Sequence, residues 1–304
     1  MEYVLQTNGL TKRYKSFQAL NGLTMHVPKG VIYGFVGKNG AGKTTLLRLI
    51  CGLQKPTSGN FTLYGIRNDS KDIIKSRRRM GAVVETPSIY MDMTAEENLK
   101  QQYLILGLPS YDGIPELLKL VGLKNTGKKR VKNFSLGMKQ RLGIAIALVG
   151  DPDFLVLDEP TNGLDPQGIV EMREMILKLN RERQITVLIS SHNLDELSRL
   201  ATYYGFIDAG SIACEMSAAE LESSLQKCVR MTVTNIAVLA RVLDEMEIEY
   251  KIIDAQSADV FARPNITQLS LALSKGGCEV LTTEEHNENL ESFYISLLGD
   301  DGHE

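Results

Sequence analysis

The chain contains 304 residues, of which 43% are hydrophobic and none is Trp, and its 34 Lys+Arg against 37 Asp+Glu give a formal net charge of −3. This ordinary globular composition excludes disordered, collagen-like and fibrous proteins, and the length predicts two domains. The nearly neutral balance argues against a nucleic-acid-binding protein with a broad basic surface. No apolar run approaches the roughly 18 residues of a membrane-spanning helix. Because the start of the chain does not resemble a signal peptide and the four cysteines match no metal or redox motif, we expect a reduced cytoplasmic protein.

The first two hundred residues alternate strand-like and helix-like segments. Predicted strands are Tyr3–Gln6, Leu23–Val27, Val31–Val36, Asn60–Tyr64, Met80–Val84, Phe154–Leu157, Ile185–Ser190 and Tyr204–Asp208. Predicted helices are Lys43–Cys51, Ala95–Leu106, Ile114–Val121, Gly137–Val149, Gln167–Asn180 and Asn193–Leu200. Continuously apolar strands separated by crossover helices are typical of an α/β domain with a largely parallel sheet. We place this domain at residues 1–214, with a helical subdomain inserted at about 86–150.

The remaining residues, 215–304, have a different pattern and are predicted to form a small second domain. Its predicted elements are strand Val229–Thr234, helix Ile236–Met246, strands Tyr250–Asp254 and Asp259–Ala262, helix Asn265–Leu273, strand Cys278–Thr282 and helix Glu288–Leu298. This order is typical of a ferredoxin-like split β-α-β fold of the α+β class. No motif in this domain indicates its role.

A glycine-rich segment satisfies the P-loop pattern G-x-x-x-x-G-K-[ST]. It reads Gly37-Lys38-Asn39-Gly40-Ala41-Gly42-Lys43-Thr44-Thr45 and lies between a predicted strand and a predicted helix, as phosphate binding requires. Glycines allow successive backbone N–H groups to face one anion, and the helix N-terminus adds partial positive charge. Lys43 would reach the β- and γ-phosphates and the Thr44 hydroxyl would bind Mg²⁺. The alternative is a glycine-rich turn that binds nothing. The predicted strand and helix on either side favour phosphate binding over this alternative.

Two carboxylates end the apolar strand before Pro160. Asp158 would hold Mg²⁺ through water, and Glu159 would accept a proton from the attacking water. The alternative is that both acids only cap the strand. Next to a P-loop, this pair favours nucleotide hydrolysis.

Further motifs resemble those of ATP-binding cassette (ABC) proteins. The segment Phe134-Ser135-Leu136-Gly137-Met138 resembles the signature L-S-G-G-Q, with Phe, Leu and Met as departures from it. Asp165 lies in a segment similar to the D-loop of that family. His192 resembles its switch histidine, and Tyr14 the aromatic residue that stacks on adenine. Together the motifs cover about residues 2–211.

This resemblance implies a P-loop NTPase cassette that binds ATP and Mg²⁺ and hydrolyses ATP. It also implies a sandwich of two copies, in which Ser135, Leu136, Gly137 and Met138 contact the nucleotide of the sister copy while His192 positions Glu159 and the water. A separate integral membrane permease would be the partner, with the chain peripheral on the inner face of the cell membrane and no nucleic acid bound. A soluble cassette ATPase without a transport role is the alternative class.

The chain departs from the family at the Gln loop, where it has Glu85. A carboxylate accepts hydrogen bonds and carries charge, whereas an amide also donates. Glu85 resembles the corresponding residue of bacitracin-resistance and lantibiotic-immunity cassettes, which implies export of, or immunity to, a peptide antibiotic. Exporters of other drugs, lipids or ions remain open. We expect Glu85 to bind Mg²⁺ or to orient the water, the alternative being a solvated side chain.

An apolar and aromatic cluster lies in what should be a surface loop, and consists of Ile89, Tyr90, Met91 and Met93. It either packs within the helical subdomain or contributes to a groove that accepts a short helix of the membrane subunit.

Overall fold

The computed structural model describes residues 2–225, 227–261, 266–287 and 290–299. The chain divides into two compact units, Met1–Ala218 and Ala219–Glu304. The sequence places the boundary between residues 214 and 215, which lies inside strand β10, Ser211–Ser217.

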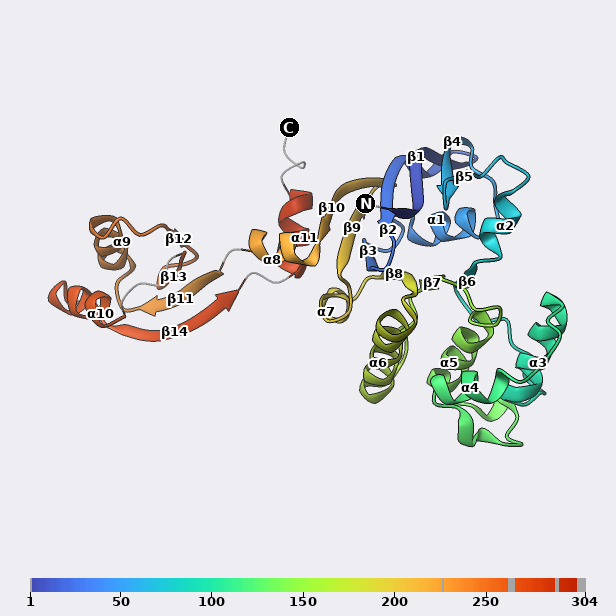
Figure 1. The fold of residues 1–304 in the computed structure, drawn as a ribbon. Coiled ribbons are helices and arrows are strands. Elements are labelled where there is room, and N and C mark those ends of the chain that lie inside the picture. Colours follow the sequence, from blue (N-terminus) through green and yellow to red (C-terminus); the bar gives the residue numbers. More distant parts are fainter. Residues whose placement is uncertain (1, 226, 262–265, 288–289, 300–304) are drawn as a thin grey trace. The chain divides into compact units, whose positions relative to one another are not determined.

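The first unit is built on a six-stranded sheet with the order β10-β9-β3-β8-β7-β6 (Figure 1). Its other strands are β3 (Ile32–Val36), β6 (Met80–Val83), β7 (Phe154–Asp158), β8 (Thr186–Ser191) and β9 (Tyr203–Asp208). All neighbouring pairs are parallel except β9 with β10. Strands β3, β7 and β8 are buried along their whole length, as expected of a sheet that is covered on both faces. The predicted α/β domain with a largely parallel core is thereby confirmed.

A second, antiparallel sheet has the order β2-β1-β4-β5. Its strands are β1 (Tyr3–Tyr14), β2 (Phe17–Pro28), β4 (Ser58–Leu63) and β5 (Ile66–Arg67). The sequence predicted β1 and β2 too short, because only part of this hairpin is buried and its outer half carries polar residues. The hairpin closes through a tight turn in which Lys15 has φ +50°.

Helix α1 (Lys43–Ile50) contributes Leu46, Leu47, Leu49 and Ile50 to one core cluster that includes residues of both sheets, such as Leu5 and Phe35. These apolar residues lie on one side of the helix, while the side chain of Arg48 is partly exposed, as is typical of an amphipathic helix that packs on a core. The core therefore fixes the start of α1 against both sheets.

Helices dominate between β6 and β7. They are α3 (Ala95–Leu106), α4 (Ile114–Leu120) and α5 (Leu136–Ala147), with single 3₁₀ turns at Lys124–Thr126 and Val131–Asn133. Figure 1 shows these helices gathered in one group, and the end of α5 packs against β6, where a Cβ on Gly81 would clash with the carbonyl oxygen of Ala147. Thr94 and Glu97 form a capping box at the start of α3, which satisfies two otherwise unpaired N–H groups. The remaining helices of this unit are α2 (Ile73–Arg77), α6 (Pro166–Arg183) and α7 (Leu194–Ser198).

The second unit contains a four-stranded antiparallel sheet with the order β12-β13-β11-β14. Its elements are α8 (Ala218–Ser224), β11 (Lys227–Val233), α9 (Ile236–Glu245), β12 (Tyr250–Ile252), β13 (Ser257–Val260), α10 (Ile266–Lys275), β14 (Val280–Asn287) and α11 (Leu290–Gly299). This strand order confirms the predicted ferredoxin-like split β-α-β fold. The predicted end of one strand at Ala262 and the predicted helix starts at Asn265 and Glu288 lie outside the described residues.

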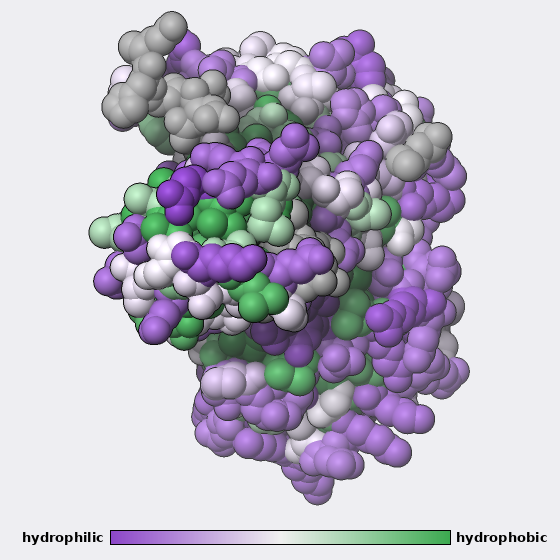
Figure 2. Space-filling model, turned by 90° about the vertical axis from the view of Figure 1, so that its left-hand side faces the viewer, coloured by the Kyte–Doolittle hydropathy of each residue, from purple (hydrophilic) through white to green (hydrophobic). Residues whose placement is uncertain are grey.

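One face of the molecule is mostly hydrophilic, with hydrophobic residues visible in smaller groups (Figure 2). Among the described helices, none combines the length and the apolar character needed to cross a membrane.

Candidate functional site

The P-loop forms a tight turn between β3 and α1. Gly40 and Gly42 have φ values of +84° and +111°, which L side chains rarely adopt. A Cβ on Gly42 would lie 2.5 Å from the carbonyl oxygen of Ala19, so glycine is required there for packing as well. Because Gly42 also precedes α1 without a capping side chain, the first N–H groups of the helix remain available to an anion.

Lys43 is buried at the start of α1, with only 6% of its surface exposed. Its Nζ donates to the carbonyl oxygens of Gly37 and Lys38 and lies 3.7 Å from Oε1 of Glu159. Burial lowers the pKa of Lys43, while the carboxylates of Glu159 and Asp158 act in the opposite direction. The ammonium group therefore sits inside the loop, held by carbonyl oxygens that a phosphate could replace.

The two carboxylates lie at the carboxyl end of β7, beside the P-loop. Asp158 is 5% exposed, and its Oδ1 accepts a hydrogen bond of 2.6 Å from the Ser190 hydroxyl. Glu159 has a left-handed backbone with φ +49°, a conformation that costs a non-glycine residue roughly 1–2 kcal/mol. This turn separates the two side chains, so Asp158 is enclosed while Glu159 reaches the cavity.

His192 follows β8, the neighbour of β7 in the sheet. Its Nδ1 lies 2.7 Å from Oε2 of Glu159. Both residues line a cavity of about 290 Å³ that the P-loop closes on one side. The cavity is lined by Phe17, Ala19, Lys38, Asn39, Gly40, Gly42, Lys43, Thr44, Thr45, Glu159, Asn162 and His192. The structure thus brings most of the P-loop residues together with Glu159 and His192 around one cavity.

Asn162, at the start of the D-loop segment, lines this cavity, whereas the signature residues and Asp165 do not. Ser135 caps α5 by accepting a hydrogen bond of 3.3 Å from the Met138 N–H. Asp165 caps α6 in the same way, with 3.1 Å to the Gly168 N–H. The two motifs adjoin each other, because a Cβ on Gly163 would lie 3.0 Å from a methyl group of Leu136. Within one chain they form a second surface, separate from the P-loop cavity.

Tyr14 lies at the end of β1, opposite Phe17 across the hairpin turn. The Tyr14 hydroxyl donates to Oε1 of Gln54, and the Lys12 ammonium lies 5.1 Å from the centre of the Tyr14 ring. Phe17, rather than Tyr14, lines the cavity, and 59% of its surface is exposed. Sequence reasoning missed Phe17, because the pairing with Tyr14 lies in the polar outer part of the hairpin, which was not predicted to be strand.

Glu85 follows β6 with φ +62° and also lies outside the P-loop cavity. Its carboxylate forms an ion pair with Arg48 of α1. Arg48 lies on the helix that the P-loop begins, so Glu85 is linked to the nucleotide site through this helix. The described residues contain no group of three or more His, Cys, Asp or Glu placed to hold a metal ion by themselves.

The parallel sheet, the P-loop and the carboxylate pair define a P-loop nucleoside triphosphatase with an inserted helical subdomain. The sequence profile described as "ABC transporter" matches residues 20–162. The chain is 40% identical to the bacitracin transport ATP-binding protein BcrA of Bacillus licheniformis, over 98% of both chains. It is 44% identical to the lantibiotic transport ATP-binding protein SrtF of Streptococcus pyogenes, over 70% of this chain and 90% of SrtF.

Solved structures agree with these relatives. The dimeric post-hydrolysis state of the ATP-binding cassette MJ0796, bound to ADP and Pi, has 26% identity and a TM-score of 0.64 over 70% of this chain and 98% of that one. The structure of cbiO1 from Clostridium perfringens has 26% identity and a TM-score of 0.65 over 81% of this chain and 97% of that one. The chain belongs to the family of ABC transporter ATP-binding proteins. It is an ATP-binding and ATP-hydrolysing subunit of a transporter.

Proposed function

We propose that the chain is the ATPase subunit of an exporter that removes a peptide antibiotic or provides immunity to one. The observation that carries this proposal is the 40% identity to BcrA, which extends over 98% of both chains and therefore includes the second unit. The likeness to the lantibiotic transport protein SrtF supports the same class of substrate. ATP hydrolysis belongs to residues 1–214 in this proposal, and residues 215–304 form a separate domain.

The P-loop N–H groups and Lys43 bind the phosphates of ATP in this proposal. Phe17, which lines the cavity, and Tyr14, which pairs with it across the hairpin turn, are the aromatic residues that would contact the adenine base. Thr44 and Asp158 offer a hydroxyl and a carboxylate, which are the oxygen ligands that Mg²⁺ prefers. This donor set fits the metal, because a magnesium ion that is also bound to phosphate needs few protein ligands. The ion would neutralise charge on the phosphates during hydrolysis.

Glu159 is the general base in this proposal and His192 holds it in place. The hydrogen bond between them fixes one carboxylate oxygen, which leaves the other to accept a proton from water. Glu85 would contribute a further oxygen to the metal or the water once it releases Arg48.

Two copies of the chain would enclose two ATP molecules. The support is that Ser135, Leu136, Gly137 and Met138 lie outside the cavity of their own chain, at the start of α5. A helix start with a Ser cap is well suited to contact phosphate oxygens. Asp165 of the adjoining D-loop would enter the same interface. The structural relative MJ0796 is itself dimeric.

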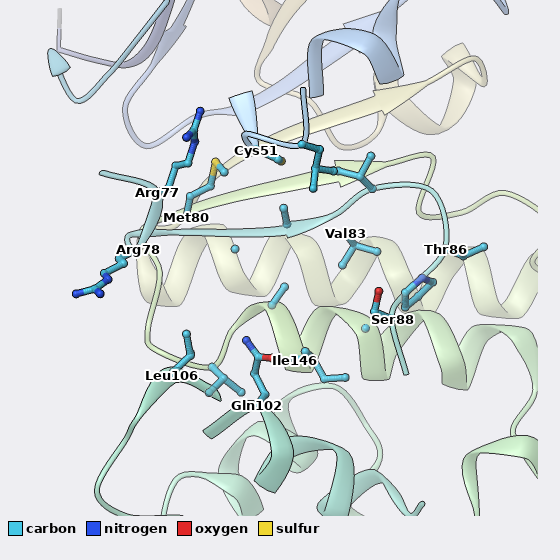
Figure 3. Close-up of a pocket in the computed structure, with 18 of the residues that line it drawn as sticks. Cys51, Arg77, Arg78, Met80, Val83, Thr86, Ser88, Gln102, Leu106 and Ile146 are labelled. Carbon is cyan, nitrogen blue, oxygen red and sulfur yellow. The ribbon is translucent and has the colours of Figure 1, made fainter. Parts of the chain in front are cut away.

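A separate permease subunit would dock into a groove between β6 and the helical subdomain. This groove has a volume of about 540 Å³, and Figure 3 shows Met80 and Val83 on one side of it with Gln102, Leu106 and Ile146 on the other. Its walls are largely apolar, which suits an amphipathic helix. Docking there would hold the chain at the cytoplasmic face of the membrane.

The segment Ile89–Met93 continues this surface. Asn98 of α3 holds the backbone of Tyr90 on both sides, accepting from its N–H at 2.7 Å and donating to its carbonyl at 3.0 Å. The side chains of Tyr90 and Met91 nevertheless remain exposed. The backbone is thus tied to the helical subdomain, and in this proposal the exposed side chains contact the permease.

The test is a resistance assay in a sensitive bacterium that expresses the chain together with a candidate permease. We expect a higher minimal inhibitory concentration of bacitracin or a lantibiotic, and no protection with Glu159→Gln. Protection against neither peptide, while ATPase activity persists, would contradict the proposed substrate class. Co-purification with ribosomes instead of the permease would contradict a transport role.

A further inference from the structure

Ser190 lies at the carboxyl end of β8, between the two acidic residues of the site and His192. In the parallel register of β7 and β8 it pairs with Asp158. It is completely buried and does not line the nucleotide cavity. Ser190 therefore cannot touch ATP in this arrangement, yet it contacts both residues that are proposed to act on it.

The Ser190 hydroxyl makes two hydrogen bonds that use different parts of the group. It donates to Oδ1 of Asp158 at 2.6 Å and accepts from the N–H of Glu159 at 3.1 Å. An ionised carboxylate can only accept, so the single hydroxyl hydrogen is committed to Asp158 and a lone pair is left for Glu159. One oxygen atom thereby fixes the carboxylate of Asp158 and the backbone of Glu159 at the same time.

The backbone of Glu159 needs this support because its φ of +49° is unfavourable for a residue with a side chain. The carbonyl of Ser190 accepts from the same N–H at 3.1 Å, so both polar oxygens of Ser190 hold this turn. The turn directs Asp158 inward and Glu159 into the cavity. The geometry of the two acidic side chains thus depends on Ser190.

We propose that Ser190 is a positioning residue for ATP hydrolysis, which orients Asp158 toward the metal and Glu159 toward the attacking water. This inference rests on the roles proposed above for Asp158 and Glu159. It differs from a simple packing role, because the other buried serine and threonine hydroxyls described in this unit are bonded to backbone groups only. Ser76, for example, is also buried and donates to the Leu63 carbonyl at 3.1 Å.

The experiment compares Ser190→Ala and Ser190→Thr with Ser76→Ala as the matched control. Three quantities are measured: binding of a fluorescent ATP analogue in EDTA, kcat of ATP hydrolysis, and the Mg²⁺ concentration at half-maximal rate. Loss of a residue that orients a metal ligand typically costs about 10–100-fold in metal affinity or activity. We expect Ser190→Ala to bind the analogue normally without metal, but to require about tenfold more Mg²⁺ or to lose about tenfold in kcat.

Ser190→Thr keeps the hydroxyl and should recover most of the lost activity, whereas Ser76→Ala should leave all three quantities unchanged. An unaltered Mg²⁺ titration and kcat in a folded Ser190→Ala protein would overturn the inference. Equal losses in the Ala and Thr variants would do so as well, because they would indicate packing rather than the hydroxyl. If Ser190→Ala does not fold, Ser190→Cys, which keeps the volume but donates weakly, should show the same defect. An inactive wild-type chain would instead contradict the proposed function.

Discussion

Nδ1 of His192 lies 2.7 Å from Oε2 of Glu159, although the two residues are 33 positions apart in the chain. They meet because β7 and β8 are parallel neighbours that end at the same edge of the sheet. An ionised carboxylate only accepts hydrogen bonds, so this contact assigns the hydrogen to Nδ1. The contact holds Glu159 beside the P-loop.

Replacing Glu159 by Gln should stop hydrolysis while nucleotide binding persists. The amide cannot accept a proton from water, and general-base assistance is worth on the order of 10²–10⁴ in rate. We expect a loss of at least about 100-fold in kcat, with dimers in analytical ultracentrifugation when ATP and Mg²⁺ are present. A Glu159→Gln chain that stays monomeric and binds no nucleotide would contradict both the site and the sandwich.

The sandwich makes ATP hydrolysis by the isolated chain depend on encounters between two copies. The rate should therefore rise faster than linearly with protein concentration. A mixture of a Lys43→Ala chain with a Ser135→Arg chain should regain activity, because one of the two composite sites then has an intact P-loop and an intact signature. A strictly first-order dependence and an inactive mixture would argue for hydrolysis within single chains.

Phe17 should contribute to the affinity for ATP, although it belongs to none of the sequence motifs. It lines the P-loop cavity with 59% of its surface exposed, and an aromatic contact with a base is worth about 1–3 kcal/mol. Phe17→Ala should raise the KM for ATP by about fivefold or more at nearly unchanged kcat. Tyr14→Ala serves as the comparison, and a KM that changes only in the Tyr14 variant would show that Tyr14 alone contacts the base.

Glu85→Gln should alter the Mg²⁺ dependence of hydrolysis and leave stability nearly unchanged. Its ion pair with Arg48 is exposed to solvent, and such pairs contribute only about 0–1 kcal/mol. Arg48→Gln removes the same ion pair but keeps the carboxylate, so it separates a role of Glu85 at the metal from a role through α1. An identical Mg²⁺ titration in wild type and Glu85→Gln would show that Glu85 does not act at the metal and that its role is limited to the ion pair with Arg48.

Tyr33 should make the first unit sensitive to alkali. Its hydroxyl donates to Oε1 of Glu215 at 2.6 Å, and burial, followed by the nearby Glu215 charge, raises the pKa of Tyr33 well above its ordinary value. Above about pH 10 the unfolded chain loses the phenolic proton while the folded chain retains it, so the free energy of unfolding falls as the pH rises. Urea titrations should show a weaker fall for Tyr33→Phe, and no difference for Tyr90→Phe on the surface.

The parts of the candidate site that can be predicted from the sequence are those whose residues are adjacent in the chain. The P-loop and the pair Asp158 and Glu159 are local patterns with strong steric and chemical requirements. Ser190 and the ion pair of Glu85 with Arg48 depend on which strand and helix lie side by side, and no local pattern contains that information. The hairpin of β1 and β2 was predicted too short for a related reason, since its outer residues pair through their backbone without an apolar signal.

In the second unit, β11 and β14 are adjacent, and Lys227 at the beginning of one pairs with Asn287 at the end of the other. The chain therefore enters and leaves this sheet at neighbouring points, a few ångströms apart. The segment between α8 and α11 could therefore be deleted and replaced by a short linking peptide, or by another inserted sequence. The segment from β11 to β14, which is a part of this unit, can in this sense be removed while the two cut ends stay within reach of each other.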